Sequence, residues 1–139
     1  MMIIALHLYV QNEDLGQRCL AAAVHPERLD KGTGGFQGLE LRGSNMRLIK
    51  SQLGGQPHVP RSYFQGATPE NGYQLPDPPY TMEFSDNPYS EDAGMGTYKV
   101  FVACSGADSD RPVTVSQAEG IWRAIEWSTL IVGVREPAG

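Results

Sequence analysis

The chain has 139 residues, which suits one domain, because domains typically hold ~100–150 residues and half of this chain would lack a sufficient core. No apolar run approaches the ~18 residues needed to cross a bilayer, so a membrane-spanning helix is excluded. The 11 Lys and Arg residues against 16 Asp and Glu residues give a net charge of −5. No overall positive field therefore draws the chain to nucleic acid or to an anionic membrane, and neither is expected as a partner.

Three amphipathic helices are predicted in the first part of the chain. Apolar residues recur at spacings of three and four over residues 2–10 and share a face over residues 14–24. Asn12 or Asp14 could cap the second of these helices, because their side chains accept hydrogen bonds from free backbone amides. A third helix is predicted over residues 44–53, where two glycines follow the last apolar position.

Residues 56–97 are rich in Pro, Gly, Asn and Asp, which is typical of turns. The same segment contains many aromatic rings, whereas disordered linkers are poor in them. We therefore predict an ordered layer packed over the domain, with short strands near residues 61–65 and 80–84 and with exposed rings that form a binding surface. The candidate binding residues are Tyr73, Tyr80, Phe84 and Tyr89.

The last third of the chain predicts a β-meander over residues 98–135. Runs of β-branched and aromatic residues indicate four strands, at 98–104, 112–116, 121–126 and 130–134. Their connections are too short for parallel crossovers, so the strands are expected to be antiparallel. Helices followed by strands predict one α+β domain over residues 1–139, with the N-terminal helices packed on a curved antiparallel sheet of about four or more strands.

The strand at 121–126 raises the question of which face meets the helices. Alternation places Trp122 and Glu126 on one face, and we expect Trp122 to be mostly buried beneath the first two helices. Glu126 would then lie at the edge of the core and would need a cationic partner, for which Arg135 or Arg111 are available. Glu126 and Tyr98 are the candidate acid/base residues if the protein is an enzyme.

Other short motifs give weak chemical signals. The loop from Cys104 to Arg111 is similar to the phosphate-binding loop of cysteine phosphatases, but it is one residue too long and Asp108 would repel phosphate; Arg111 is expected to pair with an aspartate of this loop. The Gly32–Gly38 run lacks the flanking strand and lysine of a nucleotide loop and predicts a flexible connection. Cys19 and Cys104 are predicted to be free thiols, and the three histidines lack metal-ligand spacing. We therefore predict no metal site and no cofactor.

Several longer strings resemble a small uncharacterised bacterial protein family over most of the chain: Gly66–Tyr73, Asn87–Ser90, Lys99–Ser109, Arg111–Thr114 and Gly120–Leu130. That family has no established activity, so the resemblance implies no catalytic residue. Gly120-Ile-Trp-Arg123 gives a looser likeness to the nuclear transport factor two-like cone fold. That likeness implies a pocket lined by the inward faces of the last strands.

Three hypotheses about function follow. The first is a non-enzymatic module that binds a partner protein or a small apolar ligand through the aromatic layer and the adjoining sheet. The second is a small enzyme with a carboxylate in a pocket, and the third is a structural subunit that forms a homodimer through a sheet edge. A cytoplasmic location is expected, because the N-terminus carries no basic segment or cleavage-site pattern.

Overall fold

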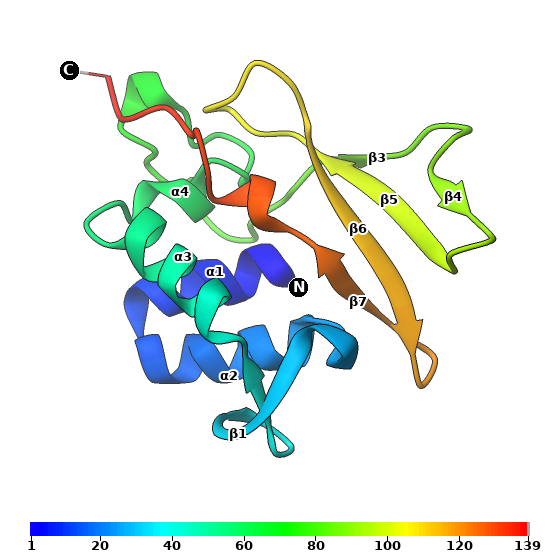
Figure 1. The fold of residues 1–139 in the computed structure, drawn as a ribbon. Helices are drawn as coiled ribbons and strands as arrows, with labels where there is room; N and C mark the ends of the chain where they lie inside the picture. Colours follow the sequence, from blue (N-terminus) through cyan, green and yellow to red (C-terminus); the bar gives the residue numbers. More distant parts are fainter. Residues whose placement is uncertain (139) are drawn as a thin grey trace.

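A computed structural model describes residues 1–138 as N-terminal helices packed against an antiparallel sheet, which is the expected α+β class (Figure 1). The helices are α1 (Met2–Gln11), α2 (Glu13–Ala23), α3 (Gly43–Leu53) and α4 (His58–Arg61). The strands are β1 (Leu29–Phe36), β2 (Leu39–Leu41), β3 (Phe84–Ser85), β4 (Glu91–Asp92), β5 (Thr97–Val102), β6 (Arg111–Ala118) and β7 (Ile121–Glu126). Single 3-10 turns form η1 (Pro26–Arg28), η2 (Pro69–Asn71) and η3 (Ser128–Leu130).

The main sheet has the order β3-β5-β6-β7, and β4 pairs with a further part of β5. All of these pairings are antiparallel, and β5, β6 and β7 form the predicted meander. The outer edge of β7 is bonded to the chain after α2, where the His25 amide donates to the Ala124 carbonyl at 2.8 Å. None of the helices over residues 1–138 has the length and apolar character needed to span a bilayer.

The first two helices lie side by side and supply much of the core (Figure 1). Asn12 separates them and caps α2, because its side chain accepts a hydrogen bond from the Leu15 amide at 3.1 Å. Gly16 allows the helices to approach closely, since a Cβ atom there would lie 2.2 Å from the Tyr9 Cα. Leu6 and Leu20 are fully buried between the layers.

The predicted flexible connection at Gly32–Gly38 is instead a β-hairpin made by β1 and β2. Its glycines make room for the partner strand, because a Cβ at Gly35 would lie 2.0 Å from the Leu39 carbonyl oxygen. At Gly32 a Cβ would overlap the Glu40 carboxylate. The prediction was wrong because the glycine run was interpreted as chain freedom, whereas here it permits close packing.

The segment after α3 contains no strand at residues 61–65. Pro57 precedes α4, which ends at Arg61, and residues 62–65 form turns instead of the predicted strand. Tyr63 is buried, and its hydroxyl donates to the Leu130 carbonyl oxygen at 2.6 Å. The strand expected near residues 80–84 is limited to β3, which begins at Phe84.

The C-terminal segment contains no strand at 130–134. It leaves the sheet after β7 through η3 and then passes back toward α4 and η2 (Figure 1). Gly133 has φ +67°, which interrupts an extended chain. Arg111 holds the segment by donating to the carbonyl oxygens of Thr129, Val132 and Gly133 at 2.5–3.1 Å. The expected pairing of Arg111 with a loop aspartate was therefore wrong, and Asp108 pairs with Arg135.

The two tryptophans have opposite environments, and the expected burial of Trp122 was wrong. Trp122 is 53% exposed, whereas Trp127 is 4% exposed. Both Trp122 and Ala124 point toward the helices, but α1 and α2 cover only the part of the sheet that includes Ala124, which is buried. Alternation identified the correct face and could not show how far the helices extend over it.

Candidate functional site

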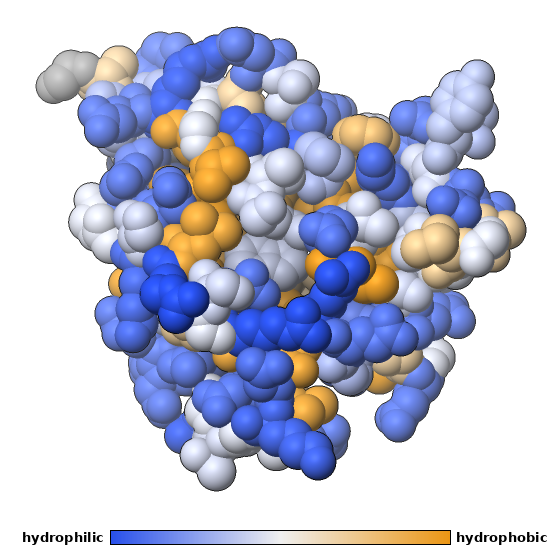
Figure 2. All heavy atoms as spheres, in the orientation of Figure 1, coloured by the Kyte–Doolittle hydropathy of each residue, from blue (hydrophilic) through white to orange (hydrophobic). Residues whose placement is uncertain are grey.

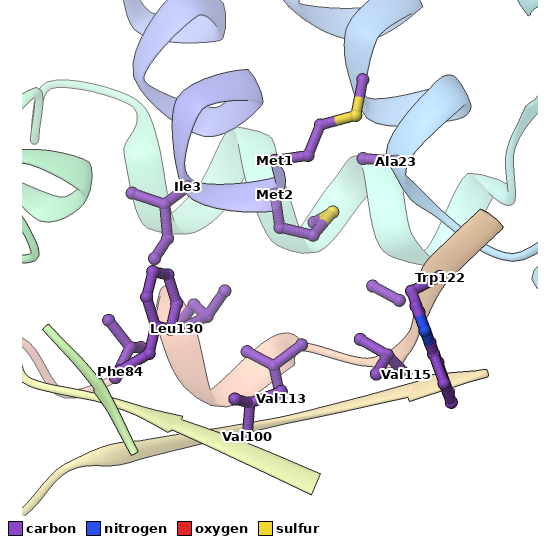
Figure 3. Close-up of a pocket in the computed structure, with 12 residues that line it drawn as sticks. Met1, Met2, Ile3, Ala23, Phe84, Val100, Val113, Val115, Trp122 and Leu130 are labelled. Carbon is purple, nitrogen blue, oxygen red and sulfur yellow. The ribbon is translucent and has the colours of Figure 1, made fainter. Parts of the chain in front are cut away.

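An apolar cleft lies between the N-terminal end of α1 and the inner face of the sheet (Figure 3). Its volume is about 250 Å³. Figure 3 shows Met1, Met2 and Ala23 on one side and Val100, Val113 and Val115 on the other. All twelve lining residues are hydrophobic. The other six are Ile3, Phe84, Val102, Trp122, Ala124 and Leu130.

Strand alternation positions the sheet side of this cleft. Val100 is paired with Val113 in the β5–β6 register, and Val115 is paired with Ala124 in the β6–β7 register. Residues directly opposite each other in an antiparallel pair point to the same face, so these side chains form one apolar surface. The three valines are only partly buried, because the cleft separates them from α1.

Two aromatic rings flank the cleft. Phe84 on β3 is 52% exposed and lies near Leu130 at one end, while Trp122 on β7 lies at the other end (Figure 3). Val102 and Leu130 are fully buried and close the cleft toward the core. The cleft is therefore walled by the core on its inner side and bordered by exposed rings where it meets solvent.

The inner face continues beyond Trp122 into an adjoining groove of about 510 Å³. Tyr98 lies there in an edge-to-face contact with Trp122, and the ring centroids are 6.4 Å apart. The Tyr98 hydroxyl donates to the Asp86 carboxylate, and this hydrogen bond raises the pKa of the phenol, with further contributions from burial and from the charges of Asp86 and Glu91. Tyr98 therefore stays protonated near neutral pH and serves as a donor, not as a base.

The four candidate binding residues do not form one surface. Phe84 lines the cleft, and Tyr80 is partly exposed beside Phe64, with ring centroids 5.4 Å apart. Tyr89 is 91% exposed in the turn that precedes β4. Tyr73 is fully buried, contrary to the expectation of an exposed ring. Its ring stacks on His58 at 5.1 Å and its hydroxyl donates to the Arg135 carbonyl oxygen, so this tyrosine fixes the C-terminal segment.

The acid/base candidates Glu126 and Tyr98 line different depressions and do not form one site. Glu126 lies beside the start of α3 and pairs with Arg28 at 3.4 Å. The expected partners Arg135 and Arg111 are engaged elsewhere, so that expectation was wrong. The Glu126 side chain is largely exposed, and no burial cost forces it to take a buried partner.

The thiols and histidines were the remaining candidates for reactive or metal-binding groups. Cys19 and Cys104 are both free, as predicted. The Cys104 Sγ lies 3.3 Å from the Ser62 hydroxyl oxygen. Cys104 belongs to the same buried core cluster as Tyr63. Within residues 1–138, no three His, Cys, Asp or Glu side chains lie close enough together to hold a metal ion.

The main residues of the cleft were not predicted from the sequence; they are Val100, Val113, Val115 and Met2. The alternating valines of β5 and β6 were a usable signal, since they mark one apolar face. What they could not reveal is that the helices leave part of this face uncovered. That depends on where α1 begins relative to the sheet, which only the folded structure defines.

A helical layer against one antiparallel sheet makes this chain an α+β domain with a cleft between its layers. The chain belongs to the DUF6935 family, a domain of unknown function, whose family model matches residues 1–138. No curated protein and no solved structure matches the chain. Membership agrees with the resemblance to an uncharacterised family and transfers no activity. The likeness to the nuclear transport factor two-like cone fold stays a prediction.

Proposed function

We propose that this domain binds a small apolar ligand in the cleft between α1 and the sheet. The observation that supports the proposal is the uncovered apolar face of β5 and β6. Val100, Val113 and Val115 face Met2 across the cleft, and no side chain of the protein fills the space between them. Concave apolar sites that open to solvent are typical places for small ligands to bind.

The size and chemistry of the cleft favour a ligand over solvent. A dry apolar cavity of ~150 Å³ can bind benzene, so about 250 Å³ accommodates an apolar group larger than a benzene ring. Water gains little there, because the lining side chains are hydrophobic and offer few hydrogen-bonding groups. An apolar ligand would release that water and cover the valines, which stabilises the complex by ~25 cal/mol per Å² of apolar surface removed from solvent.

The alternative hypotheses are less well supported. An enzyme would need reactive groups that converge, whereas Glu126 and Tyr98 line separate depressions. A dimer formed through the β7 edge would have to displace the hydrogen bond between the His25 amide and Ala124. Binding of a small ligand requires no rearrangement of either region.

Isothermal titration calorimetry with 1-octanol is the direct test, because this probe is apolar and uncharged. We expect saturable binding with a negative heat-capacity change, the signature of apolar burial. Val115→Phe should fill the cleft and weaken binding more than tenfold. Thr114→Phe is the matched control, since it adds the same ring to the opposite face of β6 and should leave the affinity unchanged.

Equal binding by the unaltered chain and by Val115→Phe would contradict the proposal, provided that circular dichroism shows both to be folded. Absence of any saturable binding to the unaltered chain would contradict it as well.

A further inference from the structure

The inner face of the sheet carries one row of paired residues that runs from the cleft to a carboxylate. Val115 lines the cleft and is paired with Tyr98 on β5, and Tyr98 is paired with Glu91 on β4. Residues opposite each other in antiparallel strands share a face, so Val115, Tyr98 and Glu91 lie on the same side of the sheet. Neighbouring strands are ~4.8 Å apart, which places Glu91 about 10 Å from Val115 along this row.

An aromatic corner lies between the apolar cleft and this carboxylate. Trp122 lines both the cleft and the adjoining groove, and the edge-to-face contact with Tyr98 holds the two rings together. Figure 3 shows the Trp122 ring at one end of the cleft, beyond Val115. A ligand that extends from the cleft toward β4 would pass these rings first, and aromatic faces attract cations.

The charged side chains that line the groove beside the aromatic corner are acidic. Glu91 lines the groove on the face of Tyr98, and Asp86 accepts the hydrogen bond from Tyr98. Asp92 follows Glu91 directly, so it points to the opposite face, where it accepts a hydrogen bond from the Met95 amide. None of the salt bridges among residues 1–138 involves Glu91 or Asp86. The nearest basic residue in the strand, Lys99, follows Tyr98 directly and therefore points to the opposite face of β5.

We propose that the ligand of the cleft is a cationic amphiphile, with an apolar body between α1 and the sheet and an amine against Trp122, Tyr98 and Glu91. This inference rests on the proposed function, because the apolar body occupies the same cleft. The charge complementarity comes from Glu91 and Asp86, and the aromatic corner supplies a surface that accepts an ammonium group. A ligand with an anionic head would be repelled at the same position.

Three probes with the same octyl chain separate these possibilities: n-octylammonium, 1-octanol and octanoate. An alkylamine is protonated at pH 7, because its pKa resembles the ~10.4 of lysine. At pH 7 and low salt, we expect calorimetry to show octylammonium binding about tenfold more tightly than octanol, and octanoate binding most weakly. Added salt should reduce the preference for the amine, since exposed charges are screened.

Two variants test whether the Glu91 carboxylate causes the preference for octylammonium over octanol. Glu91→Gln should reduce the ratio of the affinity for octylammonium to the affinity for octanol from about tenfold toward one. Glu70→Gln removes one exposed carboxylate from η2, outside the cleft and the groove, and should leave the order of the three probes as it was.

The outcomes distinguish this inference from the function on which it rests. Equal affinities for octylammonium and octanol, or tighter binding of octanoate, would contradict the inference of a cationic head group. The proposal of an apolar binding site would not be affected. If none of the probes binds, both ideas fail. A concentration-dependent dimer that excludes all three probes would show that a second copy of the chain covers the cleft, and this would also overturn both.

Discussion

Aromatic rings are buried in one region of this domain and partly exposed in another. In the packed region, where α4 and η2 meet the C-terminal segment, Tyr63 and Tyr73 are fully buried and each hydroxyl donates to a carbonyl oxygen of that segment. In the open region, the end of the sheet near β4, Tyr98 contacts the half-exposed Trp122. The first arrangement fixes the fold, whereas the second leaves apolar and aromatic surface available.

The surface agrees with this contrast. Figure 2 shows a largely hydrophilic face on which hydrophobic atoms gather along the C-terminal segment and beside β7. Along the C-terminal segment, Val132 and Val134 pack against the core and are only partly exposed. Around the cleft, half-exposed rings border an apolar space instead. Exposed apolar surface bordered by polar residues is typical of binding sites, so the proposed site lies apart from the region that fixes the fold.

The largest expected difference is between the two tryptophans, which are five residues apart. Trp127→Ala should lower the free energy of unfolding by about 3–5 kcal/mol, because it removes a buried ring from the core. Trp122→Ala should cost less than about 1.5 kcal/mol, because half of the ring is already in solvent. Urea denaturation measures both values, and similar losses would mean that the two regions are equally packed.

A smaller difference is expected between two cationic residues. Arg111→Met should lower the free energy of unfolding by about 2–3 kcal/mol, since it removes the donors that hold the carbonyl oxygens of Thr129, Val132 and Gly133. Lys99→Met, in the open region, should stay within about 0.5 kcal/mol. Thermal unfolding of the matched pair tests this, and an Arg111→Met protein as stable as Lys99→Met would show that the C-terminal segment does not depend on the guanidinium.

Much of the architecture was predictable because it depends on local patterns. Hydrophobic periodicity and the Asn12 cap predicted α1 and α2, and runs of β-branched residues predicted the meander. The predictions failed where a long-range contact decides the conformation. The C-terminal segment resembles a strand in composition, but Arg111 occupies carbonyl oxygens that a strand would need for its ladder.

The candidate site was less predictable than the fold for a related reason. A cleft forms where two layers overlap only in part. The sequence specifies the apolar faces of the layers but not how far these faces overlap. Phe84 was identified as an aromatic of the binding layer, whereas Tyr73 in the same layer is buried. Composition alone could not separate these rings, because the difference lies in their contacts with the C-terminal segment.

A pH effect of smaller size should come from the packed region. Burial lowers the pKa of His58, and the nearby Arg61 guanidinium lowers it further while Glu136 raises it. Burial and Arg61 also lower the pKa of His7. Because the folded protein binds these protons less readily than the unfolded chain does, stability is fully present above pH 6.5, the unfolded value, and falls as the pH drops toward the folded pKa values.

Urea denaturation at pH 7.5 and pH 5 measures this loss. The double variant His7→Gln/His58→Gln should lose less stability between the two pH values than the unaltered chain does. An unchanged difference would assign the acid sensitivity to carboxylates instead. A chain that becomes more stable in acid would contradict the sign of both pKa shifts.

The smallest expected effect is at Tyr89, which is 91% exposed in the turn before β4. Tyr89→Ala should change the free energy of unfolding by less than about 0.5 kcal/mol, because the ring contributes almost no buried area. Tyr73→Ala, from the same aromatic segment, should lower the free energy of unfolding by several kcal/mol, because removing a large buried side chain leaves a cavity.

Measuring the free energy of unfolding of both variants at several protein concentrations adds a further comparison. If Tyr89→Ala is destabilising only at high concentration, the ring is covered by a second copy, and the open region then serves as an interface. If it is neutral at every concentration, Tyr89 is free for a partner and the contrast between the two regions holds.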